Sequence, residues 1–68
     1  MDSNWTKIYE TGAPYKAEMI KGLLEENNIE AVVINKKDSA YLFGELEVFV
    51  RADNVIKAKR ILTTHNEK

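Results

Sequence analysis

The chain has to hold its fold together with a small hydrophobic core, because it has 68 residues and no cysteine. A domain of this size buries only about 60% of the surface that its unfolded chain exposes, so the core is marginal. Disulfides are excluded, and we expect no structural zinc because His65 is the single histidine and zinc sites cluster thiolates and imidazoles. Association with another subunit is the remaining means of stabilisation. We therefore expect one domain, residues 1–68, that forms a homodimer.

The composition is that of a folded globular protein with no bias toward a charged partner. Hydrophobic residues make up 44% of the chain and charged residues 31%, which is too apolar for disorder. The net charge of −1 provides no attraction toward nucleic acid or an anionic membrane. No apolar run is typical of a signal peptide or approaches the roughly 20 residues that span a bilayer. We expect a cytoplasmic protein that binds neither membranes nor nucleic acid.

Hydrophobic periodicity predicts five elements in the order β-α-β-β-α. Two stretches carry apolar residues at helical spacing, and three show the alternation or the continuous apolar run of strands. All apolar stripes are buried if both helices cover one face of a three-stranded sheet, so we expect an α+β two-layer sandwich. The ordered core should cover about residues 5–63, with a frayed polar tail over residues 64–68. The predicted strands are residues 5–10, 29–35 and 46–51, and the predicted helices are residues 14 to 26 or 27 and residues 54 to about 63.

Local signals mark the ends of both predicted helices. Pro14 suits a first helical position, where its missing N–H would have no partner in any case. Asn27 and Asn28 end the first helix, because Asn accepts the left-handed conformation that often closes a helix. Asp53 is a suitable N-cap for the second helix. The expected core stripes are Ala17, Ile20, Leu23 and Leu24 in the first helix, and Val55, Ala58, Ile61 and Leu62 in the second.

Strand alternation predicts an aromatic surface on the sheet face away from the helices. In the first strand Thr6 and Ile8 should share one side, and in the third strand Leu46, Val48 and Val50 should point inward. The residues that then share the outer face are Trp5, Lys7 and Tyr9 from the first strand, and Phe49 and Arg51 from the third. We interpret this face as a candidate interface for a second copy or a protein partner. The alternative is a single-stranded RNA-binding module that stacks bases on these aromatics, although the RNP1 pattern and a basic footprint are missing.

The connector between the second and third strands is a second candidate contact. It contains three consecutive large apolar residues, Tyr41, Leu42 and Phe43, which follow Lys36 and Lys37. Such residues in a long loop indicate a contact for a partner or ligand. The alternative is that they fold back and cap the small core.

No residue pattern indicates catalysis. His65 falls in the predicted polar tail, where it could not be held to the precision that catalysis needs. Glu45 and Glu47 alternate on one side of a strand and are expected to be solvated rim charges. Asp38 and Ser39 are typical of a turn, and there is no glycine-rich phosphate loop. We predict a protein that is not an enzyme and uses no metal or cofactor.

Four segments and Ala58 carry a resemblance to a known family, and most of their positions belong to the core pattern. The segments are Tyr9–Thr11, Ala17–Glu25, Asn28–Val32 and Leu46–Val50. Over residues 5–62 the chain resembles a family of short bacterial proteins described as prokaryotic signal-transducing proteins, a domain of unknown function.

The resemblance implies a truncated ferredoxin-like fold, related in shape to nitrogen-regulatory signalling proteins, and carries over no catalytic residue. Because the fourth strand of that fold is missing, the first strand would be an unpaired edge that can pair with another chain. We therefore predict a non-catalytic signalling module that binds a protein or small ligand.

Overall fold

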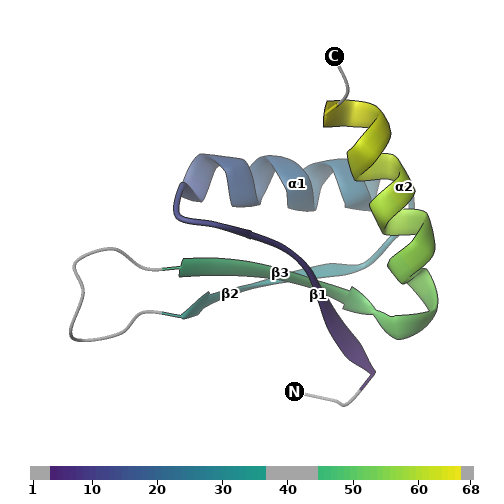
Figure 1. Ribbon diagram of the computed structural model, residues 1–68, viewed down its shortest axis with the longest axis horizontal. Coiled ribbons are helices and arrows are strands. Elements are labelled where there is room, and N and C mark those ends of the chain that lie inside the picture. Colours follow the sequence, from purple (N-terminus) through teal and green to yellow (C-terminus); the bar gives the residue numbers. More distant parts are fainter. Residues whose placement is uncertain (1–3, 37–44, 67–68) are drawn as a thin grey trace.

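The computed structural model of the protein describes residues 4–36 and 45–66. Its elements follow the predicted order β-α-β-β-α, with a short 3-10 turn, η1, before the second helix (Figure 1). The predicted element bounds are correct to within three residues. The elements are β1 (Trp5–Thr11), α1 (Pro14–Glu26), β2 (Ala31–Lys36), β3 (Glu45–Arg51), η1 (Ala52–Asn54) and α2 (Val55–Asn66).

The three strands form an antiparallel sheet in the order β1-β3-β2. Both helices lie on the same side of this sheet, with α1 along the strands and α2 beside the end of α1 (Figure 1). The α+β two-layer sandwich predicted from the apolar stripes is therefore confirmed. Among the described strands, β1 and β2 each pair with β3 alone, so both are sheet edges.

A Schellman motif ends α1 and returns the chain to the sheet. Asn28 adopts the left-handed conformation with φ 64°, which is unusual for a residue other than glycine. The backbone N–H of Ile29 donates to the carbonyl of Leu24, and that of Asn28 donates to the carbonyl of Glu25, each at 3.0 Å. Leu24 and Ile29 are 0% and 1% exposed. The turn therefore satisfies helix carbonyls and buries two apolar side chains at once.

The core lies between the helices and the inward side of the sheet. Both predicted helix stripes face it, with Leu23, Val55 and Ile61 packed at its margin. None of the described helices combines the length and the apolarity that a membrane crossing requires. The buried apolar residues are Ala17, Ile20, Leu24, Ile29, Ala31, Leu46, Val48, Val50, Ala58 and Leu62.

The second helix differs from the prediction at both ends. Asp53 is not its N-cap, because it lies inside η1 and α2 begins at Val55. The helix also continues to Asn66, so His65 occupies its last turn and not a frayed tail. No glycine or proline follows residue 63 to stop the helix, and a basic side chain near a helix C-terminus interacts favourably with the helix dipole.

A β-bulge in β1 corrects the predicted position of Tyr9. Lys7 pairs with Phe49, but the next paired residue is Tyr9, opposite Val48, so Ile8 is the extra residue. A bulge shifts the alternation of every residue that follows it. Ile8 and Tyr9 therefore both pack against the core. Tyr9 lies on the helix side of the sheet, and its predicted place on the outer face is wrong.

Candidate functional site

The sheet face opposite the helices is the candidate site, and we call it the open face. Its residues alternate along each strand with those that point into the core, and the strand register arranges them in three rows. Neither described helix lies over it (Figure 1). The first row is Trp5, Arg51 and Glu30, the second is Lys7, Phe49 and Val32, and the third is Glu10, Glu47 and Ile34.

The centre of the open face is apolar. Phe49 lies on the central strand with Val32 directly opposite it on β2, and Trp5 and Ile34 complete the group. All four side chains are half-buried, although no described element covers them. A contiguous apolar group of this kind on a small protein is typical of an interaction surface.

Arg51 orders one end of the open face. Its Nε donates to Oε1 of Glu30 at 3.4 Å, and its guanidinium carbon lies 4.8 Å from the centre of the Trp5 ring. The guanidinium of Arg51, on β3, thus contacts Trp5 of β1 by a cation–π interaction and Glu30, the residue before β2, by an ion pair. The side chains of Arg51 and Glu30 are 44% and 63% exposed, so the pair itself adds little stability. The ion pair places the Arg51 guanidinium over the Trp5 ring.

Lys7 joins two carboxylates at the other side of the face. Its Nζ lies 3.2 Å from Oε1 of Glu10 and 3.4 Å from Oε2 of Glu47. Hydrogen bonding to Glu10, and then to Glu47, raises the pKa of Lys7 above its usual value of 10.5. Glu47 is the buried member, since the whole residue is only 7% exposed. The cluster thus holds Lys7 protonated beside a largely desolvated carboxylate, which is suited to structure and recognition and not to accepting a proton.

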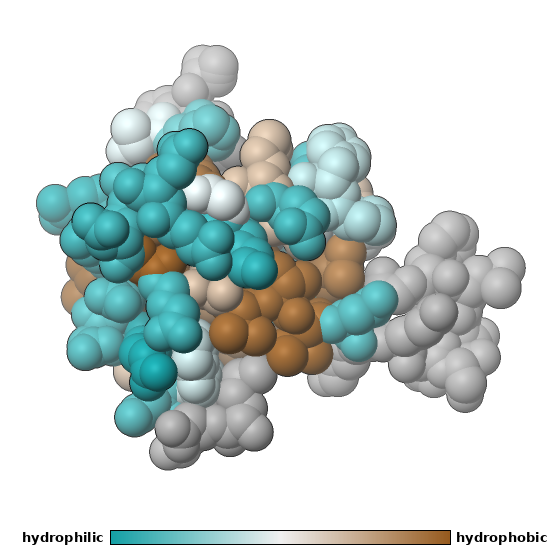
Figure 2. All heavy atoms as spheres, turned by 180° about the vertical axis from the view of Figure 1, so that it is seen from behind, coloured by the Kyte–Doolittle hydropathy of each residue, from teal (hydrophilic) through white to brown (hydrophobic). Residues whose placement is uncertain are grey.

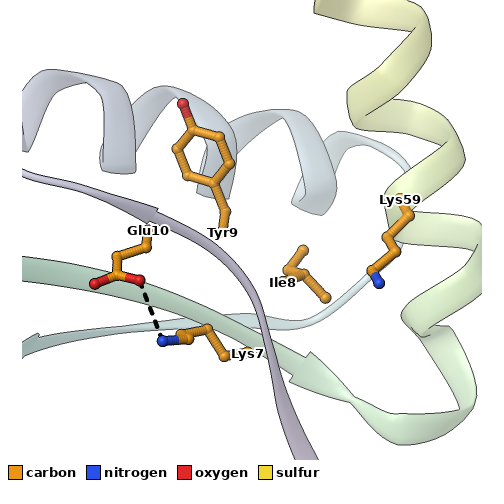
Figure 3. A pocket seen from close by; sticks show the side chains of 5 residues that line it. All are labelled: Lys7, Ile8, Tyr9, Glu10 and Lys59. Carbon is orange, nitrogen blue, oxygen red and sulfur yellow. Dashed lines mark hydrogen bonds and ion pairs between the residues drawn. The ribbon is translucent and has the colours of Figure 1, made fainter.

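A shallow depression lies beside the same cluster, at the free edge of β1. It has a volume of about 290 Å³ and is bounded by β1 and by Lys59 of α2. Figure 3 shows Tyr9 turned toward α1, and Lys7 and Glu10 joined by their ion pair on the other side of the strand. The depression is open to solvent, whereas typical ligand pockets enclose about 300–1,000 Å³ and surround most of the ligand. It therefore does not by itself indicate a small-molecule site.

The structure brings together four of the five predicted outer-face residues and separates the fifth. Trp5, Lys7, Phe49 and Arg51 share the open face as predicted, whereas Tyr9 packs on the helix side.

The predicted loop contact cannot be placed in the same way. Lys36 is the last residue of β2. Lys37, Tyr41, Leu42 and Phe43 lie outside the described residues, so their role stays a prediction.

Sequence reasoning missed the acidic half of the open face. Glu47 is buried and not a solvated rim charge, while Glu10 and Glu30 pair with the two predicted basic residues. Alternation along the third strand does predict Glu47 on the outward side with Phe49 and Arg51, but its partner Lys7 depends on the register between β1 and β3.

These carboxylates change what the face can bind. Three of them lie among the aromatic and basic residues, and carboxylates repel the phosphates that dominate nucleic-acid affinity. With Tyr9 on the other side, two aromatics remain for base stacking. Within residues 4–36 and 45–66, no three histidine, aspartate or glutamate side chains are grouped as a metal site would need. The open face is thus a mixed surface, with an apolar centre and ion pairs around it.

Comparison with known families identifies the family of the chain. The family model described as "Putative prokaryotic signal transducing protein" matches residues 5–66, from the first residue of β1 to the last of α2. The chain belongs to this family. Searches of the curated proteins and of the solved structures gave no match. The family description suggests a role in signal transduction and names no partner.

Proposed function

We propose that the chain is a cytoplasmic, non-catalytic signalling module that docks a protein partner on its open face. The observation that carries the proposal is the apolar centre formed by Trp5, Phe49, Val32 and Ile34 on a face that neither described helix covers. Apolar area supplies most of the free energy of protein association, and aromatic and arginine side chains often dominate it.

The charges around that centre favour a protein over a small ligand. Arg51 and Lys7 are each paired with carboxylates on the same face, so the surface displays both signs and a small net charge. Such a rim gives orientation and selectivity to a docking protein. A small ligand would instead need a concave pocket that encloses it, whereas the depression beside Lys7 is shallow and open.

The ionisable groups of the open face also support a binding role. Lys7 has a raised pKa, which makes it a poor base near neutral pH. Ion pairs hold Glu47 and Glu30 against Lys7 and Arg51. His65 lies in the last turn of α2, in the helix layer and away from these groups. The proposed activity is therefore recognition, with the ion pairs positioning the aromatic side chains.

Affinity capture from a lysate of the native organism tests the proposal, with RNase-treated and untreated samples compared by mass spectrometry. We expect the wild-type protein to retain a specific partner that resists RNase, and the double variant Trp5→Ser, Phe49→Ser to lose it. Ile56→Ser is the matched control, since Ile56 is 79% exposed on α2.

Two outcomes would contradict the proposal. A partner that the Trp5 and Phe49 variant retains would dock elsewhere, and RNase-sensitive capture would support the stacking alternative. Circular dichroism of each variant would show that a lost partner reflects a lost contact and not a lost fold.

A further inference from the structure

The two edges of the sheet differ in how well they are protected against pairing with another strand. Proteins protect edge strands with bulges and with lysines, which discourage pairing. β1 has both, because Ile8 is bulged and Lys59 of α2 borders the depression beside this strand. β2 pairs with β3 in an unbroken register over all six of its residues. Its described edge is therefore the one open to strand addition.

We propose that β2 pairs antiparallel with β2 of a second copy of this chain, which joins two three-stranded sheets into one of six strands. The interface runs along the free edge of β2 and uses the open-face residues of that edge only, so Trp5 and Phe49 on the other two strands stay available to the proposed docking partner. It also replaces the β1 edge, expected from the sequence to be the pairing edge, with β2.

Strand geometry restricts how two copies of β2 can pair. Residues directly opposite each other in an antiparallel pair lie on the same face of the sheet and direct their backbone groups alike. In the joined sheet the helices of both copies lie on one side. Each open-face residue of one β2 must therefore lie opposite an open-face residue of the other β2, and each core-side residue opposite a core-side residue. The pairing must therefore be centred on one residue. Centring on Val33 pairs residues 31–35 with the same residues of the second copy and Lys36 with Glu30, all within the part of the chain that the structure describes.

The Val33-centred register also matches charge with charge. It sets Glu30 opposite Lys36 of the partner subunit, and by symmetry this pair occurs twice. Within one copy Lys36 is opposite Glu45, and Arg51 is paired with Glu30 at 3.4 Å. The positions across the joined sheet would thus alternate in sign: Arg51, Glu30, the partner's Lys36 and the partner's Glu45. Centring on Val32 or Ile34 instead sets Glu30 or Lys36 opposite an uncharged residue.

The same register matches apolar residues. Val33 lies opposite the partner's Val33, and Val32 opposite the partner's Ile34. All three side chains are half-buried in the single chain, and Figure 2, which looks at the molecule from behind on the side of β2, shows a continuous hydrophobic patch there. Pairing would cover part of this patch and would satisfy the free backbone groups of the strand. A core limited by 68 residues gains apolar burial in this way.

Charge reversal tests the pairing by sedimentation across micromolar to millimolar concentrations. Glu30→Lys or Lys36→Glu alone replaces two attractive cross-strand pairs with two repulsive ones, so each should weaken self-association about tenfold or more. An equimolar mixture of the two variants should recover the dimer, because every Glu30–Lys36 position then joins opposite charges. This recovery requires both variants to be folded, so it separates a lost contact from a lost fold.

Cysteine cross-linking tests the register, since the chain has no native cysteine. Val33→Cys should give a disulfide-linked dimer with diamide, which takes up the two electrons and two protons, because opposite Cβ atoms lie about 4.5–5.5 Å apart. Val32→Cys is the matched control and should cross-link far more slowly, since its opposite residue is Ile34. A mixture of Val32→Cys and Ile34→Cys should again cross-link.

Three results would overturn the pairing. They are a monomeric wild type at millimolar concentration, single charge variants that sediment as the wild type does, and equal cross-linking of the Val33 and Val32 cysteine variants. The Trp5 and Phe49 variant that tests the open face should leave sedimentation unchanged, so failure of one proposal is distinguishable from failure of the other.

Discussion

The same three strands present two faces with different roles. On the covered face, Val48 and Val50 of the central strand are fully buried under the helices. One residue along, Phe49 is half-buried and Arg51 exposed on the open face, where ion pairs replace tight packing. Because side chains alternate along a strand, one strand can stabilise the fold with one set of residues and display the other set for recognition. Substitutions on the covered face should therefore lower the free energy of unfolding more than substitutions on the open face, whichever strand carries them.

Two valine-to-alanine substitutions test this difference most strongly. Val48→Ala removes methyl groups from a fully buried site and should lower the free energy of unfolding by about 2–3 kcal/mol. Val32→Ala removes the same groups from a half-buried site on the open face and should cost about 1 kcal/mol or less. Urea denaturation followed by circular dichroism measures both.

The pair serves as its own control, since the side-chain change is identical. Equal losses of stability would mean that the open face packs as tightly as the covered one, and the contrast between faces would fail. A small domain has a total stability of only about 0.05–0.15 kcal/mol per residue, so Val48→Ala should also be visibly less folded without denaturant.

The covered face was predictable because its signals are local. The stripe of α1 and the alternation of β3 each repeat within one element, and Asn28 marks the helix end by its own conformational preference. Tyr9 was not predictable in this way, because the bulge at Ile8 exists only relative to the register with β3. A change of one residue in that register moves every later side chain of β1 to the other face.

The open face was predictable in its residue types and not in its pairs. Alternation assigned Trp5 and Phe49 to one surface, which the register confirms. The burial of Glu47 depends on Lys7, forty residues away in the chain, and the pairing of Glu30 depends on how β2 lies against β3. Contacts between strands depend on the register in which the strands pair, and local patterns within one sequence do not reveal that register.

Arg51 allows a smaller test of how much order the ion pairs give to the open face. Arg51→Met removes the cation–π contact with Trp5 and the ion pair with Glu30, and should lower the free energy of unfolding by about 1 kcal/mol. Trp5 is the single tryptophan, so its fluorescence should also become easier to quench with acrylamide. Arg60→Met, at an exposed position of α2, is the matched control and should change neither measurement. Unchanged quenching in the Arg51 variant would show that the guanidinium does not orient the ring.

The smallest expected effect is a dependence on alkaline pH that arises on the open face alone. Hydrogen bonds to Glu10 and Glu47 raise the pKa of Lys7 above 10.5 in the folded protein, so the folded state holds this proton more tightly than the unfolded state does. The stabilisation is therefore complete below pH 10.5 and is lost as the pH rises through the higher folded-state pKa.

Lys7→Gln removes the group, so the difference in melting temperature between wild type and variant should be constant up to about pH 10 and then narrow. Lys57→Gln, on the exposed side of α2, is the matched control for the loss of one surface lysine. If the difference in melting temperature stays unchanged at the highest pH, Lys7 stabilises the protein by packing its aliphatic stem against the sheet. Packing would then contribute more than charge to the stability of the open face, as it does on the covered face.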